Sequence, residues 1–98
     1  MLRWTWDPAK AATNLKKHGV SFDLASRVFG DPYAITLPDP YPHEDRWRTV
    51  GMPSSNSRVL LFVVHTGVDE ADPDPIGRII SARRAEPRER KAYEEGQF

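Results

Sequence analysis

The chain has 98 residues, nine prolines and no cysteine, and its fourteen Lys and Arg residues balance fourteen Asp and Glu residues. This length supports a single domain, residues 1–98, and the missing cysteines exclude disulfides and thiolate metal ligands. The balanced charge argues against a protein that coats nucleic acid through phosphate attraction alone. We find no secretion signal and no run near the roughly 18 apolar residues of a membrane helix, so we expect a cytoplasmic protein with no membrane contact.

The first third of the chain predicts one short strand followed by two helices. Residues 4–6 suit a strand that ends at Asp7-Pro8, where Asp can cap a helix and Pro can occupy its first turn. The helix over residues 9–18 ends at Gly19, because glycine adopts the left-handed conformation at low cost. Apolar residues at helical spacing predict the second helix over residues 21–29.

Four further strands and a final helix are predicted after residue 33. Residues 59–64 form the most apolar run in the chain, which is typical of a strand buried on both faces at the centre of a sheet. Pro87 suits the first turn of the last helix. The expected elements are strands over 34–37, 46–52, 58–66 and from Arg78 onward, and a helix over 87–95.

These elements predict an α+β fold. Short connections between the later strands favour antiparallel pairing, so we expect a four- to five-stranded antiparallel sheet. Two N-terminal helices and one C-terminal helix would pack on one face of it. The other face would then be open to a ligand.

Basic residues are concentrated near the C-terminus. Arg83 and Arg84 end a strand, so their side chains point to opposite faces, and a rigid guanidinium matches the geometry of a phosphate. The alternative is that these are solvated charges or ion pairs with the acidic loop 69–74. The basic residues within this stretch are Arg78, Arg83, Arg84, Arg88, Arg90 and Lys91.

Three segments carry a resemblance to a known family. They are Trp6-Asp7-Pro8 with Asn14 to Phe22, then Val28 to Pro32, then Arg78 to Ala85 followed by Glu89 and Tyr93, with Glu44, Arg46 and Gly51 between them. In this order they closely resemble the BrnT family of small toxins from bacterial type II toxin–antitoxin systems. The chain differs from the family at loop 69–75, which is longer and more acidic than the usual connection.

The resemblance implies a RelE-like fold and a ribonuclease that blocks translation. It also implies a cognate ribbon-helix-helix antitoxin, with which the toxin forms a hetero-oligomer. Promoter DNA would be bound only indirectly, through the antitoxin. The competing hypothesis is a partner-binding module of the same fold that acts as a co-repressor without cleaving RNA. A direct DNA-binding domain is disfavoured because no helix is both basic and placed for groove recognition.

A metal-independent ribonuclease needs cations around the phosphate, a base for the 2′-hydroxyl and an acid for the leaving 5′-oxygen. Arg83 is the first candidate for the phosphate, by its strand-end position and its match to the family motif, with Arg84 and Arg46 in support. The candidates for substrate binding are Ser81, Arg78 and Arg88.

Proton transfer has four candidates, among which the sequence does not choose. Lys17 and His18 match the family motif, although a basic helix end is also ordinary helix termination. Tyr93 can stack on a base or donate a proton, or simply pack against the sheet. Glu44 is a possible base near Arg46, or a solvated loop charge.

We expect no cofactor and no metal. The three histidines have no ligand spacing in common, and the aspartates of loop 69–75 lack the glycine and distal glutamate of a calcium loop.

Overall fold

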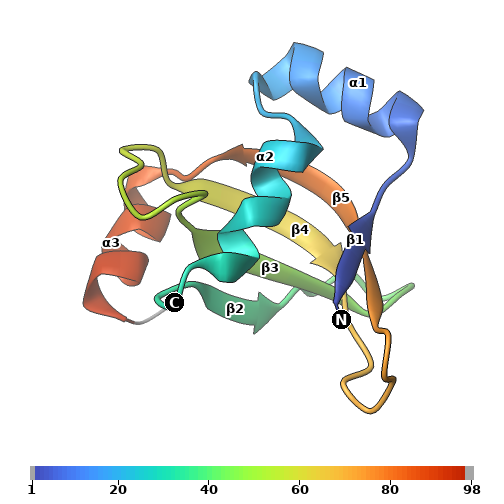
Figure 1. Ribbon diagram of the computed structural model, residues 1–98. Coiled ribbons are helices and arrows are strands. Elements are labelled where there is room, and N and C mark those ends of the chain that lie inside the picture. The colour runs from blue at the N-terminus through green and yellow to red at the C-terminus, as the bar shows by residue number, and fades with distance from the viewer. Residues whose placement is uncertain (1, 97–98) are drawn as a thin grey trace.

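A five-stranded sheet forms the centre of the computed structural model, which describes residues 2–96 (Figure 1). Helices lie at one edge of the sheet and on both of its faces. The strands are β1 (Arg3–Thr5), β2 (Ile35–Pro38), β3 (Arg46–Gly51), β4 (Leu61–Thr66) and β5 (Ile76–Arg84). The helices are α1 (Pro8–His18), α2 (Phe22–Ser26), the 3₁₀ helix η1 (Arg27–Gly30) and α3 (Pro87–Glu95).

The strand order is β1-β5-β4-β3-β2, which confirms the α+β fold and puts the apolar strand β4 at the centre. Neighbours from β2 to β5 pair antiparallel, as predicted. The sheet is nevertheless mixed, because β1 joins β5 in parallel, with Arg3 opposite Ile76. A parallel neighbour requires a long connection. Here the connection contains α1, α2, η1 and three strands, so the short loops that favoured antiparallel pairing do not apply to β1.

Helix α1 has the boundaries that the sequence indicated, whereas α2 begins where predicted but ends at Ser26 and not at residue 29. The Asp7 carboxylate accepts the Ala9 N–H at 2.8 Å, and Gly19 ends α1 in a left-handed conformation with φ of 70°. The Ser21 hydroxyl oxygen accepts the Leu24 N–H and so caps α2. Only the second predicted helix changes type, since α2 continues as the 3₁₀ turn η1.

One face of the sheet is buried beneath α2 and η1. Side chains alternate along β4, so Leu61 and Val63 pack towards α2 while Phe62 belongs to a second cluster on the other face. The main cluster is fully buried and consists of Val20, Phe22, Ala25, Val28, Leu61, Val63, Ile79 and Ala82.

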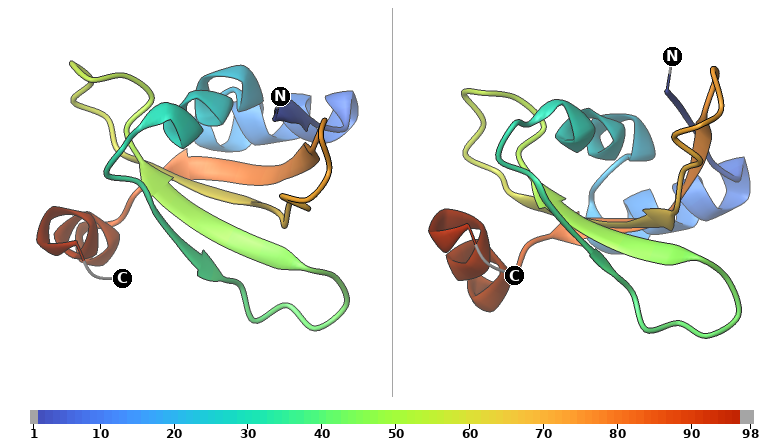
Figure 2. Two further views of the ribbon diagram at one scale, coloured as in Figure 1. Left: turned by 60° about the horizontal axis from the view of Figure 1, so that its bottom comes forward. Right: turned by 90° about the horizontal axis from the view of Figure 1, so that it is seen from below.

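The prediction that all helices pack on one face is wrong for α3. Val50, Leu60 and Phe62 form a smaller cluster against Tyr93 of α3. Figure 2 shows α3 at one end of the sheet, away from α1 and α2. The reason is that the chain leaves β5 after Arg84 and turns directly into α3, which leaves too few residues to cross to the helix side. The rest of this face is uncovered by any helix among residues 2–96.

No helix in the described part of the chain is both long and apolar enough to span a membrane.

Candidate functional site

The face of the sheet that α2 does not cover carries a set of arginines. In the register of the strands, Arg83 lies opposite Phe62, and Ser81 lies opposite Val64, which in turn faces Arg48. Alternation along β3 places Arg46 on the same side as Arg48. We refer to this surface, which bears Arg46, Arg48, Arg78 and Arg83, as the arginine face.

Arg83 is held rigidly from three directions. Its two terminal nitrogens donate to the two carboxylate oxygens of Glu89, each at 2.8 Å, and one of them also donates to the Arg84 carbonyl. The guanidinium lies 4.2 Å from the centre of the Phe62 ring. Its hydrogen bonds to Glu89 raise the pKa of Arg83. The result is a permanently charged fork with a fixed orientation.

Glu89 stays ionised although its side chain is only 8% exposed. Partial burial alone raises the pKa of Glu89, but hydrogen bonds from Arg83 and the Glu86 N–H outweigh it, so the pKa is lowered overall. Glu89 therefore links the start of α3 to the end of β5. Sequence reasoning had named Glu89 only as part of the family motif.

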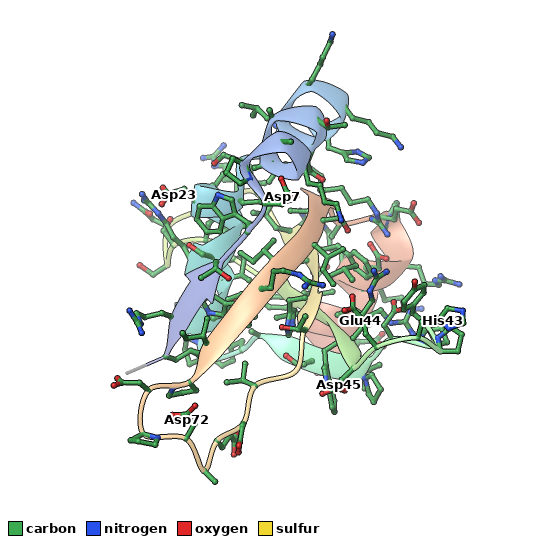
Figure 3. The ribbon with its side chains drawn as sticks, turned by 90° about the vertical axis from the view of Figure 1, so that its right-hand side faces the viewer. Asp7, Asp23, His43, Glu44, Asp45 and Asp72 are labelled. Atoms are coloured by element: carbon green, nitrogen blue, oxygen red, sulfur yellow. The ribbon has the colours of Figure 1, made fainter. Side chains whose placement is uncertain are left out.

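A second carboxylate organises the other end of the arginine face. Glu44 accepts from Arg46 at 2.7 Å and from Arg78 at 2.9 Å, and Arg46 also lies over the Tyr41 ring at 3.7 Å. Figure 3 labels Glu44 beside His43 on the β2–β3 connection. The hydrogen bond from Arg46 lowers the pKa of Glu44. This is the geometry of a residue that orients two guanidiniums, and a lowered pKa makes Glu44 a weaker base.

Lys17 and His18 lie at the edge of the sheet beside Ser81. They line a shallow pocket of about 350 Å³ between α1 and β5, together with Ile80. Both side chains are exposed. The fold therefore brings these two candidates next to the strand that carries Arg83.

Asn14 holds α1 in this position, a role that sequence reasoning missed. Its side-chain amide donates to the carbonyls of Ala82 at 2.8 Å and Val20 at 3.0 Å, while its oxygen accepts the Ala82 N–H. The Asn14 side chain thus provides hydrogen-bond partners for the backbone of β5 beyond the point where β1 ends. The one available signal was an asparagine inside the predicted helix, a residue type disfavoured there unless its side chain bonds elsewhere.

Of the three other candidates, Arg88 shares a groove with Glu89, the partner of Arg83, whereas Arg84 points to the other side of the sheet and Tyr93 has a different partner. Arg84 lies opposite Leu61, so it points to the helix side of the sheet, and it is exposed. Arg88 is exposed on α3 and lines a groove of about 360 Å³ together with Arg48. The Tyr93 hydroxyl donates to Asp31 at 2.7 Å, and the ring packs in the smaller apolar cluster.

The bond between Tyr93 and Asp31 affects both groups. Partial burial and this bond raise the pKa of Tyr93 to about 12. Burial raises the pKa of Asp31, but hydrogen bonds from the Met52 N–H and from Tyr93 lower it overall. Tyr93 therefore attaches α3 to the segment after η1, in line with the packing alternative.

Within residues 2–96, no three His, Asp or Glu side chains are grouped in a way that would hold a metal ion.

Comparison with known proteins identifies the family. The family described as "Ribonuclease toxin, BrnT, of type II toxin-antitoxin system" matches residues 6–89. The chain belongs to the BrnT family. Its fold is similar to the 1.1 Å crystal structure of the Brucella abortus ribonuclease toxin BrnT, with a TM-score of 0.64 and 24% identity over 88% of this chain and 99% of that chain. No curated protein sequence matches.

The BrnT match confirms the family that the sequence motifs indicated, and with it a ribonuclease toxin of a type II toxin–antitoxin system. The matched range includes Lys17, Glu44 and the Arg83–Glu89 pair, and it ends before Tyr93. The residues of the arginine face thus lie within the part of the chain that matches the BrnT family.

Proposed function

We propose that this toxin is a metal-independent endoribonuclease that binds RNA across the arginine face. The observation that carries the proposal is the rigid Arg83 fork, fixed by Glu89 and Phe62 on an otherwise open sheet surface. Glu89 already accepts from both terminal nitrogens of Arg83, so Arg83 would contact the scissile phosphate through its remaining N–H groups and its fixed positive charge. Arg46 and Arg78 would bind the neighbouring phosphates.

The proposed reaction is an internal transesterification. The 2′-oxygen attacks the adjacent phosphorus, a base takes the 2′-proton, and the bond from phosphorus to the 5′-oxygen breaks as that oxygen receives a proton. The products are a 2′,3′-cyclic phosphate and a 5′-hydroxyl. Arg83 stabilises the extra negative charge of the phosphorane, which is the largest single contribution in many such sites.

His18 and Lys17 are the proposed proton-transfer and phosphate-binding partners of Arg83. Both are exposed and border Ser81, two residues from Arg83 along β5. Histidine exchanges protons near neutral pH and lysine contributes a cation. Glu44 is proposed to orient Arg46 and Arg78, and Tyr93 to attach α3, because their polar atoms already have those partners.

The proposed partner is a ribbon-helix-helix antitoxin that forms a hetero-oligomer with the toxin. Promoter DNA would be contacted through the antitoxin alone. The site of action would be the cytoplasm, where translated RNA is found.

The test compares two adjacent arginines on opposite faces of β5. Antitoxin-free wild type, Arg83→Ala and Arg84→Ala are incubated with a long structured RNA in excess EDTA, and the product ends are identified. We expect Arg83→Ala to lower the cleavage rate at least 100-fold, since a charged transition-state contact is worth about 3 kcal/mol or more. Arg84→Ala, which makes the same charge change, should stay within about threefold of wild type.

Folding is checked by thermal unfolding, because Arg83→Ala leaves the Glu89 carboxylate without its cation. Arg83→Ala/Glu89→Gln removes that charge and should remain equally inactive. Equal losses for Arg83→Ala and Arg84→Ala would contradict the assignment of the face. Intact RNA with folded wild type would contradict free-standing cleavage and leave ribosome-dependent cutting or a partner-binding module.

A further inference from the structure

A second concave site lies on the helix side of the sheet. It is a pocket of about 520 Å³ between β1, the end of η1, the β2–β3 hairpin and the loop after β4. Among the lining residues, Phe29 of η1 is the one that belongs to a helix. Its lining residues are Leu2, Trp4, Phe29, Thr36, Asp45, Trp47, His65, Thr66, Gly67, Val68, Glu70 and Pro75.

Aromatic contacts fix the inner wall of this pocket. The rings of Trp4 and Phe29 stack with their centres 4.0 Å apart, and the buried His65 ring packs edge-on against both. On the other side, the indole N–H of Trp47 donates to the Asp45 carboxylate at 2.9 Å. The two tryptophans therefore have set positions and do not depend on a ligand to order them.

The charge at the pocket is of one sign. Asp45 and Glu70 are the charged acids of the lining, which contains no Lys or Arg. Carboxylates repel the phosphates of RNA and attract a cation, and the aromatic wall offers apolar contact to the stem of a Lys or Arg side chain.

Apolar surface continues beyond the pocket. Leu2, which lines it, is 42% exposed, and Ile76 on the adjacent strand β5 is 52% exposed. A protein segment that matches both the acidic pocket and this apolar surface has a cationic side chain between apolar side chains.

We propose that this pocket receives an arginine or lysine side chain, flanked by apolar residues, from the cognate antitoxin. The inference relies on the proposed function for the existence of an antitoxin partner, and it adds the site on the toxin that the antitoxin contacts. The pocket and the arginine face lie on opposite sides of the sheet, so an antitoxin attached here reaches the RNA-binding surface only with a different segment.

The test measures the dissociation constant of the purified cognate antitoxin for wild type, Glu70→Gln and Glu70→Lys at two salt concentrations. We expect Glu70→Gln to weaken binding by about three- to tenfold and Glu70→Lys by at least thirtyfold, because removing and then reversing the charge opposite a bound cation have graded effects. Asp72→Lys is the matched control. It makes the same charge reversal in the same loop outside the lining, and should change binding by less than threefold.

The inference would be overturned if the antitoxin did not bind wild type, or if Glu70→Lys and Asp72→Lys weakened antitoxin binding equally. It would also be overturned if Arg83→Ala abolished antitoxin binding while Glu70→Lys did not. RNA cleavage is measured on the same preparations. Glu70→Lys should cleave at the wild-type rate, and wild type that binds the antitoxin through Glu70 without cleaving RNA would refute only the nuclease proposal.

Discussion

At the scale of single residues, the structure depends on close contacts that only small side chains permit. Gly77 on β5 lies directly beneath the indole of Trp4, and a Cβ at this position would overlap the ring. Trp4 has little freedom to withdraw because it stacks on Phe29 and contacts His65. The absence of a side chain at Gly77 thus allows β1 to join the sheet.

Gly77→Ala should lower the free energy of unfolding by about 1–3 kcal/mol, the usual cost of overpacking a tight site. Gly30→Ala is the control, since a Cβ there meets no atom within 4 Å. Urea unfolding followed by tryptophan fluorescence measures both. A Gly77→Ala variant as stable as Gly30→Ala would show that Trp4 moves without cost.

At the scale of elements, the two long helices are attached to the sheet by polar contacts more than by apolar area. In α1 the buried residue is Asn14, and in α3 it is Glu89. Asn14 bonds both backbone groups of Ala82, and Glu89 bonds Arg83. Both attachments flank the proposed phosphate site, so the positions of the helices and of the site residues are set together.

Asn14→Ala should lower the free energy of unfolding by about 3 kcal/mol, because it leaves the buried Ala82 N–H and two carbonyls without this partner. The neighbouring Thr13→Ala removes only an exposed bond to the Ala9 carbonyl and should cost less than about 0.5 kcal/mol. Chemical denaturation distinguishes the two. Similar losses for both variants would mean that α1 is held by its other contacts.

At the scale of the whole molecule, a net charge of zero conceals two surfaces of opposite sign. The arginine face lies on one side of the sheet, and the acidic pocket with Asp45 and Glu70 lies on the other. Such a division allows one small domain to attract RNA and a cationic protein segment to different sides. The wall of the acidic pocket contains a buried titratable group, His65, which is 5% exposed.

Stability should fall as the pH is lowered below about 6.5, the ordinary pKa of histidine. Burial lowers the pKa of His65, only partly opposed by the hydrogen bond from its Nδ1 to the Thr66 carbonyl, while Nε2 accepts from Thr49. Above pH 6.5 the ring is neutral in both states. Below it the unfolded chain takes up a proton that the folded chain resists, so stability declines by up to about 1.4 kcal/mol per pH unit.

Urea midpoints at pH 8, 6.5 and 5 measure this dependence. His65→Gln should flatten the decline between pH 6.5 and 5, whereas His18→Gln, at an exposed position, should preserve it. A further loss below about pH 4.5 is expected in every variant, as the lowered pKa values of Asp31, Glu44 and Glu89 are passed. A wild-type urea midpoint that does not change from pH 8 to 5 would show that protonation of His65 does not affect stability.

The sequence by itself determined the features that depend on neighbours in the chain. Asp7, Gly19 and Ser21 marked the helix boundaries because caps and left-handed residues act within a few positions. The apolar run identified β4, and motifs spread over the chain indicated the BrnT family. Arg83 was selected as a candidate for the same reason, since a strand end and a motif are both visible locally.

The tertiary structure alone decided what depends on residues far apart. It paired β1 with β5, bridged Glu44 to Arg78, bonded Asn14 to Ala82 and attached Tyr93 to Asp31. It also decided which of the two adjacent arginines joins the arginine face, because the register puts Arg83 opposite Phe62 and Arg84 opposite Leu61. Periodicity and capping depend on residues that are close in the sequence, whereas these contacts arise only when the whole sheet has formed.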